Sequence, residues 1–165
     1  MEYRKTRDIP PITYIRFSSA GSIGRETQKE RYDEASFVEH AYAPYSHFHV
    51  GAVAKLANGE IVAGSNQENA SFPVGLCAER VLLASASTLY PNVAIESMAI
   101  SYLAGSGDSD HPIAPCGICR QSLLEYEMRV GRPIRLVLGG MEGKIYIIPQ
   151  ASTLLPLAFT SEELK

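Results

Sequence analysis

The sequence predicts an α/β protein in which a mixed sheet of five strands is layered with helices on its faces. Two observations support this prediction. Apolar side chains alternate over residues 48–56, and Asn58-Gly59 then predicts a hairpin that returns the chain antiparallel. Farther on, apolar helix-like runs over 76–90 and 116–130 are separated by a strand-like segment, and the full order is α-β-β-α-β-α-β-β.

The first element of this domain is expected to be a helix of about 15 residues that starts near Thr27. Thr27 and Glu30 have the spacing of a capping box, which satisfies backbone N–H groups at a helix start. Pro44 ends the helix, because proline cannot donate to the helical hydrogen-bond ladder. Apolar residues recur every three positions on one face: Tyr32, Ala35, Val38 and Ala41.

The remaining elements follow in the same way. Residues 60–66 form the returning strand of the hairpin, and a Pro/Gly loop leads to the helix over 76–90. Residues 95–103 are expected to form a third strand, followed by a polar loop over 104–114.

A second long helix is expected to begin at Cys116. Two further strands, over 134–138 and 144–148, are separated by a glycine-rich turn. The tail over 152–159 is expected to form a short helical turn that Pro156 ends. Together these elements indicate one compact domain.

We expect the domain to cover residues 26–165 and residues 1–25 to form an N-terminal extension. The extension is the least regular part of the chain, although residues 13–17 are compatible with a short strand. With 165 residues the chain is long enough to bury its own core.

The composition excludes several classes of protein. A hydrophobic content of 45%, a charged content of 20% and a net charge of −3 are ordinary for a globular protein and give no general attraction to nucleic acid or membrane. No secretory signal or membrane-spanning run is evident. Three cysteines do not form a disulfide framework, so we expect free or metal-bound thiols and a cytoplasmic location.

The three cysteines are candidates for a single metal site. Cys77 opens one expected helix, and Cys116 and Cys119 lie in the first turn of the other, where backbone N–H groups and the helix dipole favour thiolates. Zinc suits such ligands, whereas an iron–sulfur cluster usually needs four cysteines. Structural zinc sites normally have four protein ligands, and three therefore indicate an open catalytic site.

Two charged residues beside Cys77 add to this site. Glu79 places a carboxylate where it could accept a proton from a zinc-activated water and pass it on. Three thiolates leave a zinc ion with a net negative charge, and the guanidinium of Arg80 could offset it by donating to the sulfurs.

The pattern C-x-E at 77–79, followed by P-C-x-x-C at 115–119, resembles the zinc-dependent nucleoside and nucleobase deaminases. Members with three cysteines carry an arginine that matches Arg80, and Gln121 is expected in the same surroundings. The resemblance implies one Zn²⁺ per subunit, with Glu79 as the catalytic residue. The implied metal ligands are Cys77, Cys116 and Cys119.

Over residues 27–160 the chain is similar to the small, homotetrameric, three-cysteine type of cytidine deaminase. The segments that carry this resemblance are 43–52, 66–73 and 154–159. It implies a three-layer α-β-α sandwich around the five-stranded mixed sheet. It also implies a homotetramer that needs neither nucleic acid nor membrane.

The same resemblance implies how a nucleoside is bound. Phe48 would line the pyrimidine pocket, and Asn66 and Glu68 would hydrogen-bond the sugar hydroxyls. An amide and a carboxylate two residues apart point the same way after a strand, which suits a pair of neighbouring hydroxyls. Phe159 would reach the pocket of a neighbouring subunit and stack on the base.

The implied reaction is hydrolytic deamination of cytidine and deoxycytidine to uridine and deoxyuridine, with release of ammonia, by a zinc-activated water in pyrimidine salvage. Three alternative functions remain open: a deaminase of a related aminopyrimidine nucleoside such as blasticidin S, a nucleic-acid editing deaminase, and a non-catalytic zinc module. The sequence does not rank ribonucleosides against deoxyribonucleosides.

Several of these residues have simpler interpretations when taken alone. Cys116 and Cys119 could be a redox pair or two buried thiols. Asn66 and Glu68 could be turn residues that cap the following loop. Phe159 could be an ordinary core residue.

Overall fold

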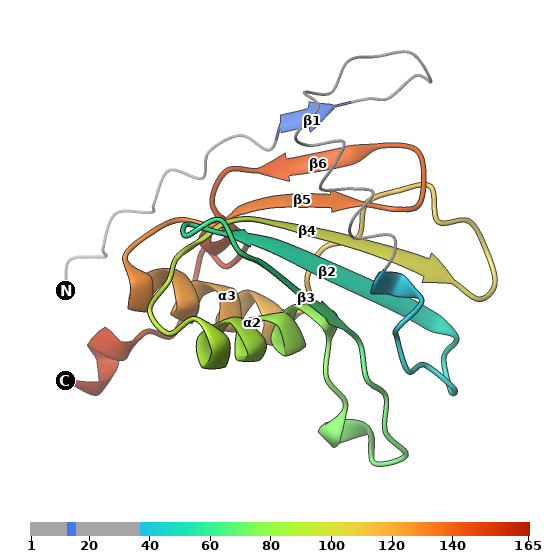
Figure 1. The fold of residues 1–165 in the computed structure, drawn as a ribbon, viewed down its shortest axis with the longest axis horizontal. Helices are drawn as coiled ribbons and strands as arrows, with labels where there is room; N and C mark the ends of the chain where they lie inside the picture. The colour runs from blue at the N-terminus through green and yellow to red at the C-terminus, as the bar shows by residue number, and fades with distance from the viewer. Residues whose placement is uncertain (1–12, 16–36) are drawn as a thin grey trace.

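The computed structural model describes residues 13–15 and 37–165, and its strands form one sheet in the order β1-β6-β5-β4-β2-β3 (Figure 1). β4 and β5 are parallel and every other pair of neighbours is antiparallel, so the expected mixed sheet is confirmed. The strands are β1 (Thr13–Ile15), β2 (Phe48–Leu56), β3 (Ile61–Ser65), β4 (Ile95–Ala104), β5 (Arg135–Gly139) and β6 (Ile145–Ile148).

Five of these strands, β2 to β6, are the ones that the sequence predicts. β1 adds a short sixth strand at the edge of the sheet, within the segment that is compatible with a strand by sequence. The boundary expected at residue 26 lies outside the described residues and stays a prediction.

The helices α2 (Ala78–Leu89) and α3 (Gly117–Val130) lie side by side on one face of the sheet (Figure 1). Both were expected from sequence, and their bounds differ from the expected ones by at most two residues. Most of the helix expected over 27–41 lies outside the described residues. Within the described part, Phe37 and Val38 are helical.

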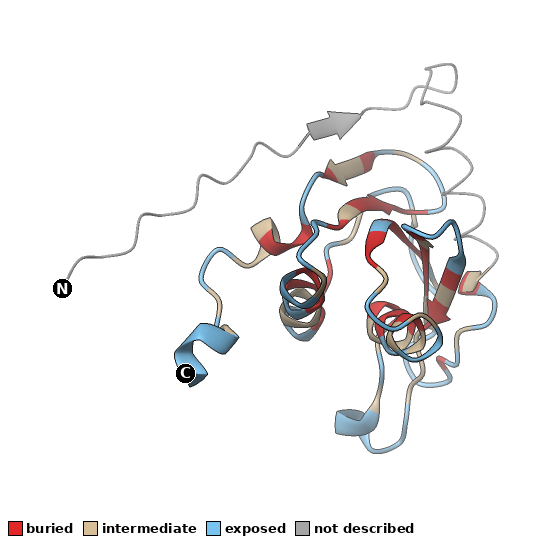
Figure 2. Ribbon diagram, turned by 60° about the vertical axis from the view of Figure 1, so that its left-hand side comes forward, coloured by how far each residue is buried: buried red, intermediate tan, exposed pale blue. Residues whose placement is uncertain are grey.

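The main core fills the space between the sheet and the two helices. Alternate residues of β2, including Ala52 and Leu56, face the helices and are fully buried, because successive side chains of a strand point to opposite faces. Leu82 of α2 and Leu123 of α3 complete this core and are 0% exposed. Figure 2 shows the buried residues gathered on the facing sides of the sheet and helices.

Gly64 determines how closely α2 approaches the sheet. A Cβ at this position would lie 2.6 Å from the carbonyl oxygen of Ala78 and 2.6 Å from the backbone nitrogen of Leu82. Only glycine leaves room for the first turn of α2 against β3, and that turn carries the candidate site residues.

A buried carboxylate connects the end of α3 to the segments that follow it. Glu127 accepts hydrogen bonds from the backbone N–H groups of Ile134 at 2.7 Å, Ala151 at 2.9 Å and Ser152 at 3.2 Å. These contacts hold the 3-10 helix Ala151–Leu154 against α3, where the sequence predicts a short helical turn.

The C-terminal end is otherwise irregular until a second 3-10 helix, Ser161–Leu164, which is exposed in Figure 2. The loop between β3 and α2 contains a third 3-10 helix, Phe72–Val74, and projects away from the sheet (Figure 1). No helix in the described part has both the length and the apolar character needed to span a bilayer.

Candidate metal and catalytic site

The two helix N-termini bring all three cysteines together, as the sequence predicts. Cys77 is the N-cap of α2, Cys116 is the N-cap of α3, and Cys119 lies in the first turn of α3. The Sγ atoms of Cys77 and Cys116 are 3.7 Å apart, those of Cys116 and Cys119 are 3.4 Å apart, and all three lie within 4.8 Å of one another.

This spacing fits a zinc ion. Tetrahedral coordination with Zn–S bonds of about 2.3 Å places sulfurs roughly 3.8 Å apart. Among the described residues, the metal-ligating group consists of these three cysteines and includes no fourth His, Cys, Asp or Glu. Three sulfurs therefore leave room for one further ligand, as in a catalytic zinc site.

The surroundings of the sulfurs favour a thiolate even without metal. The pKa of Cys77 is lowered to about 6, chiefly because the Cys119 thiol donates to its sulfur, and the positive charge of Arg80 acts in the same direction. The pKa of Cys119 is raised, because its proton is held by Cys77 and the side chain is buried. Such a cluster can lose protons to a divalent cation.

Glu79 lies in the first turn of α2, and its residue is only 4% exposed. Burial raises the pKa of its carboxyl, because the charged form loses contact with water. Within the described residues no salt bridge joins it to Arg80. Glu79 is therefore not a solvated helix carboxylate, and its raised pKa suits a group that takes up and releases protons.

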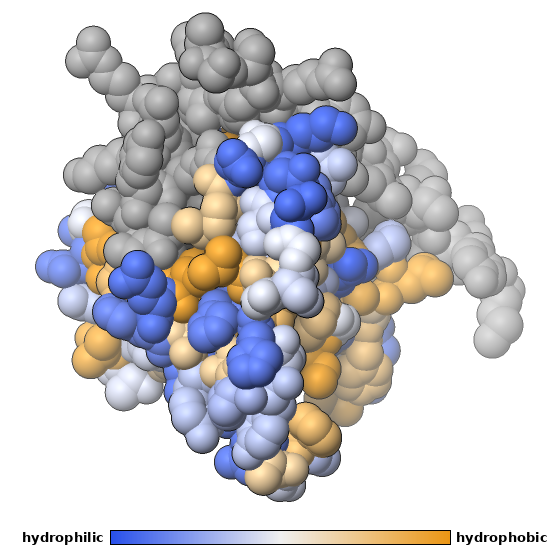
Figure 3. Space-filling view, turned by 90° about the vertical axis from the view of Figure 1, so that its right-hand side faces the viewer, coloured by the Kyte–Doolittle hydropathy of each residue, from blue (hydrophilic) through white to orange (hydrophobic). Residues whose placement is uncertain are grey.

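A cavity of about 430 Å³ adjoins this cluster and is large enough for a small-molecule ligand. Cys77, Cys116 and Glu79 are among the residues that line it. The expected substrate residues from β2 and the loop after β3 line it too: Phe48, Asn66 and Glu68. Figure 3 faces this end of the molecule, where hydrophobic patches lie between hydrophilic side chains.

Phe48 lies at the start of β2 and is partly buried. Its ring stacks on the ring of Tyr102, with the centroids 5.1 Å apart and the planes 20° from parallel. Phe48 therefore lies in the cavity wall, against a second aromatic ring that the sequence did not single out, and its contact with a pyrimidine stays a prediction.

Asn66 contacts the backbone of β2 through both ends of its amide. Its Oδ1 accepts from the N–H of Val50 at 2.7 Å, and its Nδ2 donates to the carbonyl of Phe48 at 2.9 Å. An amide has two N–H groups and two lone pairs, so one of each remains for a ligand.

Glu68 organises the loop before β2. Its carboxylate accepts hydrogen bonds from the backbone N–H of Tyr45 at 2.9 Å, and from both the N–H and the hydroxyl of Ser46. The Ser46 hydroxyl and the Tyr45 N–H lower the pKa of Glu68. The predicted sugar-binding residues therefore also hold the backbone beside the pocket. Ser46, to which the sequence assigned no role of its own, lines the pocket too.

Four predicted residues are not part of this cavity lining: Cys119 and Arg80, which belong to the sulfur cluster and its surroundings, and Phe159 and Gln121. Phe159 is 61% exposed, and its carbonyl accepts from Nε2 of Gln121 at 2.9 Å. Gln121 lines a separate hollow between α2 and α3. The structure thus connects Gln121 with the C-terminal segment, and its expected influence on the sulfurs stays a prediction.

Arg120, which follows Cys119, is a further residue that the sequence analysis missed. Its Nε donates to the carbonyl of Pro115 at 2.8 Å, and its Nη1 donates to the carbonyl of Leu154 at 3.3 Å. Because Pro115 directly precedes Cys116, Arg120 fixes the turn that presents two of the three sulfurs. Its position in the sequence P-C-x-x-C-R was the available signal.

The fold and the site together are those of a zinc-dependent hydrolase: three cysteine sulfurs at two helix ends, a buried carboxylate and an adjoining pocket. The model of the cytidine and deoxycytidylate deaminase zinc-binding region matches residues 26–132. This chain therefore belongs to the cytidine and deoxycytidylate deaminase family.

Individual relatives agree with this assignment. The cytidine deaminase of Halalkalibacterium halodurans is 39% identical over 126 residues, which cover 76% of this chain and 88% of that relative. The crystal structure of cytidine deaminase from Burkholderia pseudomallei is 35% identical, with a TM-score of 0.69 over 80% of this chain and 98% of that one. That from Mycobacterium tuberculosis is 30% identical, with a TM-score of 0.61 over 79% of this chain and 94% of that one.

Proposed function

We propose that this protein hydrolyses cytidine and deoxycytidine to uridine and deoxyuridine, with release of ammonia, in pyrimidine salvage. The observation that carries this proposal is the convergence of Cys77, Cys116 and Cys119 beside buried Glu79 at one end of a cavity. Neither a redox pair nor a set of buried thiols accounts for a carboxylate held in that position.

The three cysteines are proposed to hold one Zn²⁺. When bound there, zinc would lower the pKa of a water molecule and so supply a nucleophile near neutral pH. Cys77 and Cys116 cap their helices, so both helix dipoles and the charge of Arg80 would offset the negative charge of three thiolates.

Glu79 is proposed to carry the protons. Its carboxylate accepts a proton from the attacking water and delivers it to N3 of the cytosine ring as oxygen adds to C4. It then moves a second proton from that oxygen to the amino group, and the C4–N bond breaks to release ammonia. Water and cytidine thus give uridine and ammonia, with Glu79 returned to its starting state.

The pocket wall is proposed to orient the nucleoside. Phe48 presents an aromatic face to the base, while the remaining N–H of Asn66 and the remaining lone pair of Glu68 meet the sugar hydroxyls. Loss of either sugar contact would raise KM more for cytidine than for free cytosine.

We further propose that the protein is a homotetramer in which Phe159 completes the pocket of a neighbouring subunit. Large apolar side chains that are more than half exposed support an association surface. They include Phe72, Val74, Ile118, Leu157 and Phe159. The free thiols are consistent with the cytoplasmic location that we propose.

The deciding experiment is an absorbance assay for loss of cytidine by the purified protein, before and after chelation of zinc. Cytidine, deoxycytidine, cytosine and blasticidin S are compared as substrates. We expect turnover of the two nucleosides and loss of turnover on chelation, with recovery when zinc is returned. Turnover of blasticidin S alone would favour the related aminopyrimidine nucleoside, and turnover of none of the four would refute the proposal.

A further inference from the structure

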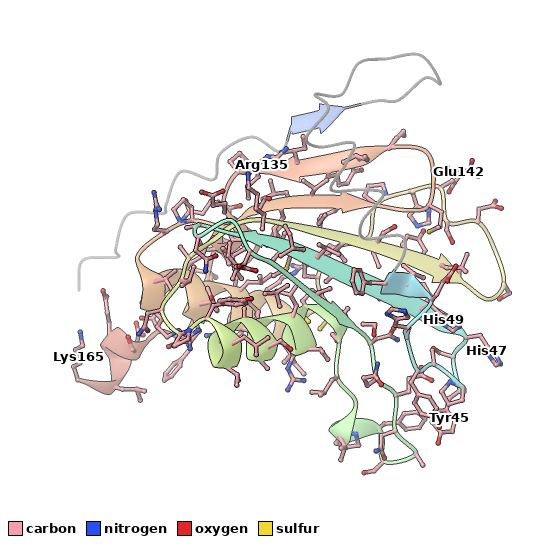
Figure 4. All side chains as sticks on the ribbon, in the orientation of Figure 1. Tyr45, His47, His49, Arg135, Glu142 and Lys165 are labelled. Atoms are coloured by element: carbon pink, nitrogen blue, oxygen red, sulfur yellow. The ribbon has the colours of Figure 1, made fainter. Side chains whose placement is uncertain are left out.

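The loop between β4 and α3 forms part of the pocket wall through its last residues, Ile113, Ala114 and Pro115. Its earlier part is held against the turn between β5 and β6. The hydroxyl of Ser109 accepts from the N–H of Ala104 at 3.0 Å, and its carbonyl accepts from the N–H of Glu142 at 3.3 Å. Figure 4 labels Glu142 on that turn, at the same end of the sheet as His47.

Two glycines allow this loop to pack backbone against backbone. A Cβ at Gly140 would lie 2.1 Å from the carbonyl oxygen of Ser109, and one at Gly143 would lie 1.9 Å from that of Asp110. The loop is therefore fixed at residues 109 and 110, a few residues before it reaches the pocket.

Tyr102 of β4 lies beneath this loop and is 2% exposed. Its ring supports Phe48 from behind, because the two rings are stacked 5.1 Å apart. Phe48 pairs with Ala104 in the register of β2 and β4, and Tyr102 pairs with Val50, so both rings lie on the face of the sheet that carries the pocket.

The buried hydroxyl of Tyr102 has its partner in the loop. It lies 3.2 Å from Nδ1 and 3.3 Å from Nε2 of His111, whose ring meets the tyrosine ring edge-on at 5.7 Å. Burial raises the pKa of Tyr102, so the hydroxyl stays protonated and can donate to the imidazole. His111 Nδ1 also lies 3.2 Å from the carboxylate of Asp110.

We propose that Tyr102 and His111 act as a pair of positioning residues that set the affinity of the pocket for the pyrimidine base. Tyr102 holds Phe48 by stacking, and its hydroxyl holds the loop at His111, two residues before Ile113. One side chain thereby fixes two parts of the wall. The inference rests on the proposed function, because the affected step is the binding of the nucleoside.

The pair is expected to change binding rather than chemistry. Glu79 and Cys119 lie in the first turns of α2 and α3, and Cys77 and Cys116 are the N-caps of these helices, whereas the contacts of the Tyr102 hydroxyl are with His111 in the loop. Loss of one hydrogen bond of ordinary net strength corresponds to about a five-fold change in an equilibrium constant.

The test uses zinc-loaded protein with Tyr102→Phe, His111→Ala and the double variant. We expect each to raise KM for cytidine, and Kd for uridine measured by calorimetry, about five-fold, while kcat stays within about two-fold and zinc content is unchanged. The double variant should match the single ones, because both remove the same hydrogen bond. His111→Gln retains a hydrogen-bonding side chain and should recover part of the loss.

Tyr126→Phe is the matched control. Tyr126 is also buried, and its hydroxyl donates to the carbonyl of Val93 at 2.7 Å, but it does not line the pocket. Both Tyr126→Phe and Tyr102→Phe should lower the thermal midpoint of unfolding, but Tyr126→Phe should leave KM and Kd unchanged.

Three outcomes would overturn the inference while the wild type remains active. They are unchanged KM and Kd in both single variants, multiplicative effects in the double variant, or an equal rise of KM in Tyr126→Phe. Loss of zinc from Tyr102→Phe would also overturn it, by showing that the pair acts on the metal ligands. A wild-type protein that neither deaminates cytidine nor binds uridine would instead refute the proposed function, and this inference with it.

Discussion

Replacement of Glu79 by glutamine tests the proposed proton transfers with little change in side-chain volume. Glu79 is 4% exposed in the first turn of α2 and lines the cavity beside Cys77 and Cys116. Glutamine cannot accept and return a proton at the pH of the reaction, although it fills the same space. The variant should therefore fold and bind zinc but lose turnover.

The expected loss follows from the two proton transfers assigned to Glu79. General acid–base catalysis contributes roughly 10²–10⁴-fold to a rate, so kcat should fall at least about 10³-fold, equivalent to about 4 kcal/mol. The assay is the decrease in cytidine absorbance, with zinc content measured on the same sample. Retention of more than about a tenth of wild-type kcat at full zinc content would refute the assignment.

The same variant should make the stability of the metal-free protein less dependent on pH. Burial raises the pKa of Glu79 in the folded state, so the folded protein binds this proton more tightly than the unfolded chain. Its contribution to stability is then present at pH values below the unfolded pKa and is lost as pH rises through the folded pKa. Urea unfolding should show this loss in the wild type and a smaller one in Glu79→Gln.

Glu127→Gln is the matched control, because Glu127 is a buried carboxylate on the other helix. It is 6% exposed and accepts three backbone hydrogen bonds, whereas it does not line the pocket. Weakening hydrogen bonds to a charged group should lower the free energy of unfolding by about 1.5–3 kcal/mol. Its kcat should stay close to that of the wild type, the reverse of the expected result for Glu79→Gln.

Three further predictions concern the support of the site. Gly64→Ala should lower the free energy of unfolding by about 1–3 kcal/mol and reduce zinc content, because its Cβ would clash with the backbone of α2. Gly117→Ala, where a Cβ has no neighbour within 4 Å, should do neither, as thermal unfolding and metal analysis of both variants would show. Cys116→Ser should abolish zinc binding and turnover, as metal titration would show, and full zinc occupancy in this variant would contradict the ligand assignment. The pKa of Glu68 is lowered, first by the Ser46 hydroxyl, so its ionised carboxylate stabilises the folded protein at pH values above the unfolded pKa. This contribution to stability is lost as pH falls through the folded pKa. Glu68→Gln should therefore be less stable than the wild type at pH 7 and converge with it in acid, and parallel unfolding curves across the pH series would contradict this.

Much of the fold could be predicted from the sequence because its determinants are local. The alternation over 48–56 and the Asn58-Gly59 turn predict the hairpin of β2 and β3, since strand period and turn chemistry act within a few residues. The order of the strands was not predictable in this way. The parallel pairing of β4 with β5 joins segments separated by α3, and no local pattern specifies that neighbour.

The same distinction between local and long-range determinants applies to the site. The pattern of Cys77, Cys116 and Cys119 predicted a metal site, because cysteines at helix starts favour thiolates whatever fold surrounds them. The hydrogen-bond partners of Asn66 and Glu68 could not be predicted from the sequence. Their hydrogen bonds span 16 to 23 residues and depend on how the loop before β2 lies beside the end of β3.

The sequence by itself thus determined the elements, the metal-binding cysteines and the carboxylate beside them, because each depends on residue type and short spacing. Only the tertiary structure decided that Glu79 is buried, that Tyr102 supports Phe48, and that His111 meets the Tyr102 hydroxyl. Burial and long-range contact arise when distant segments pack around one core, and spacing along a chain carries no information about which segments these are.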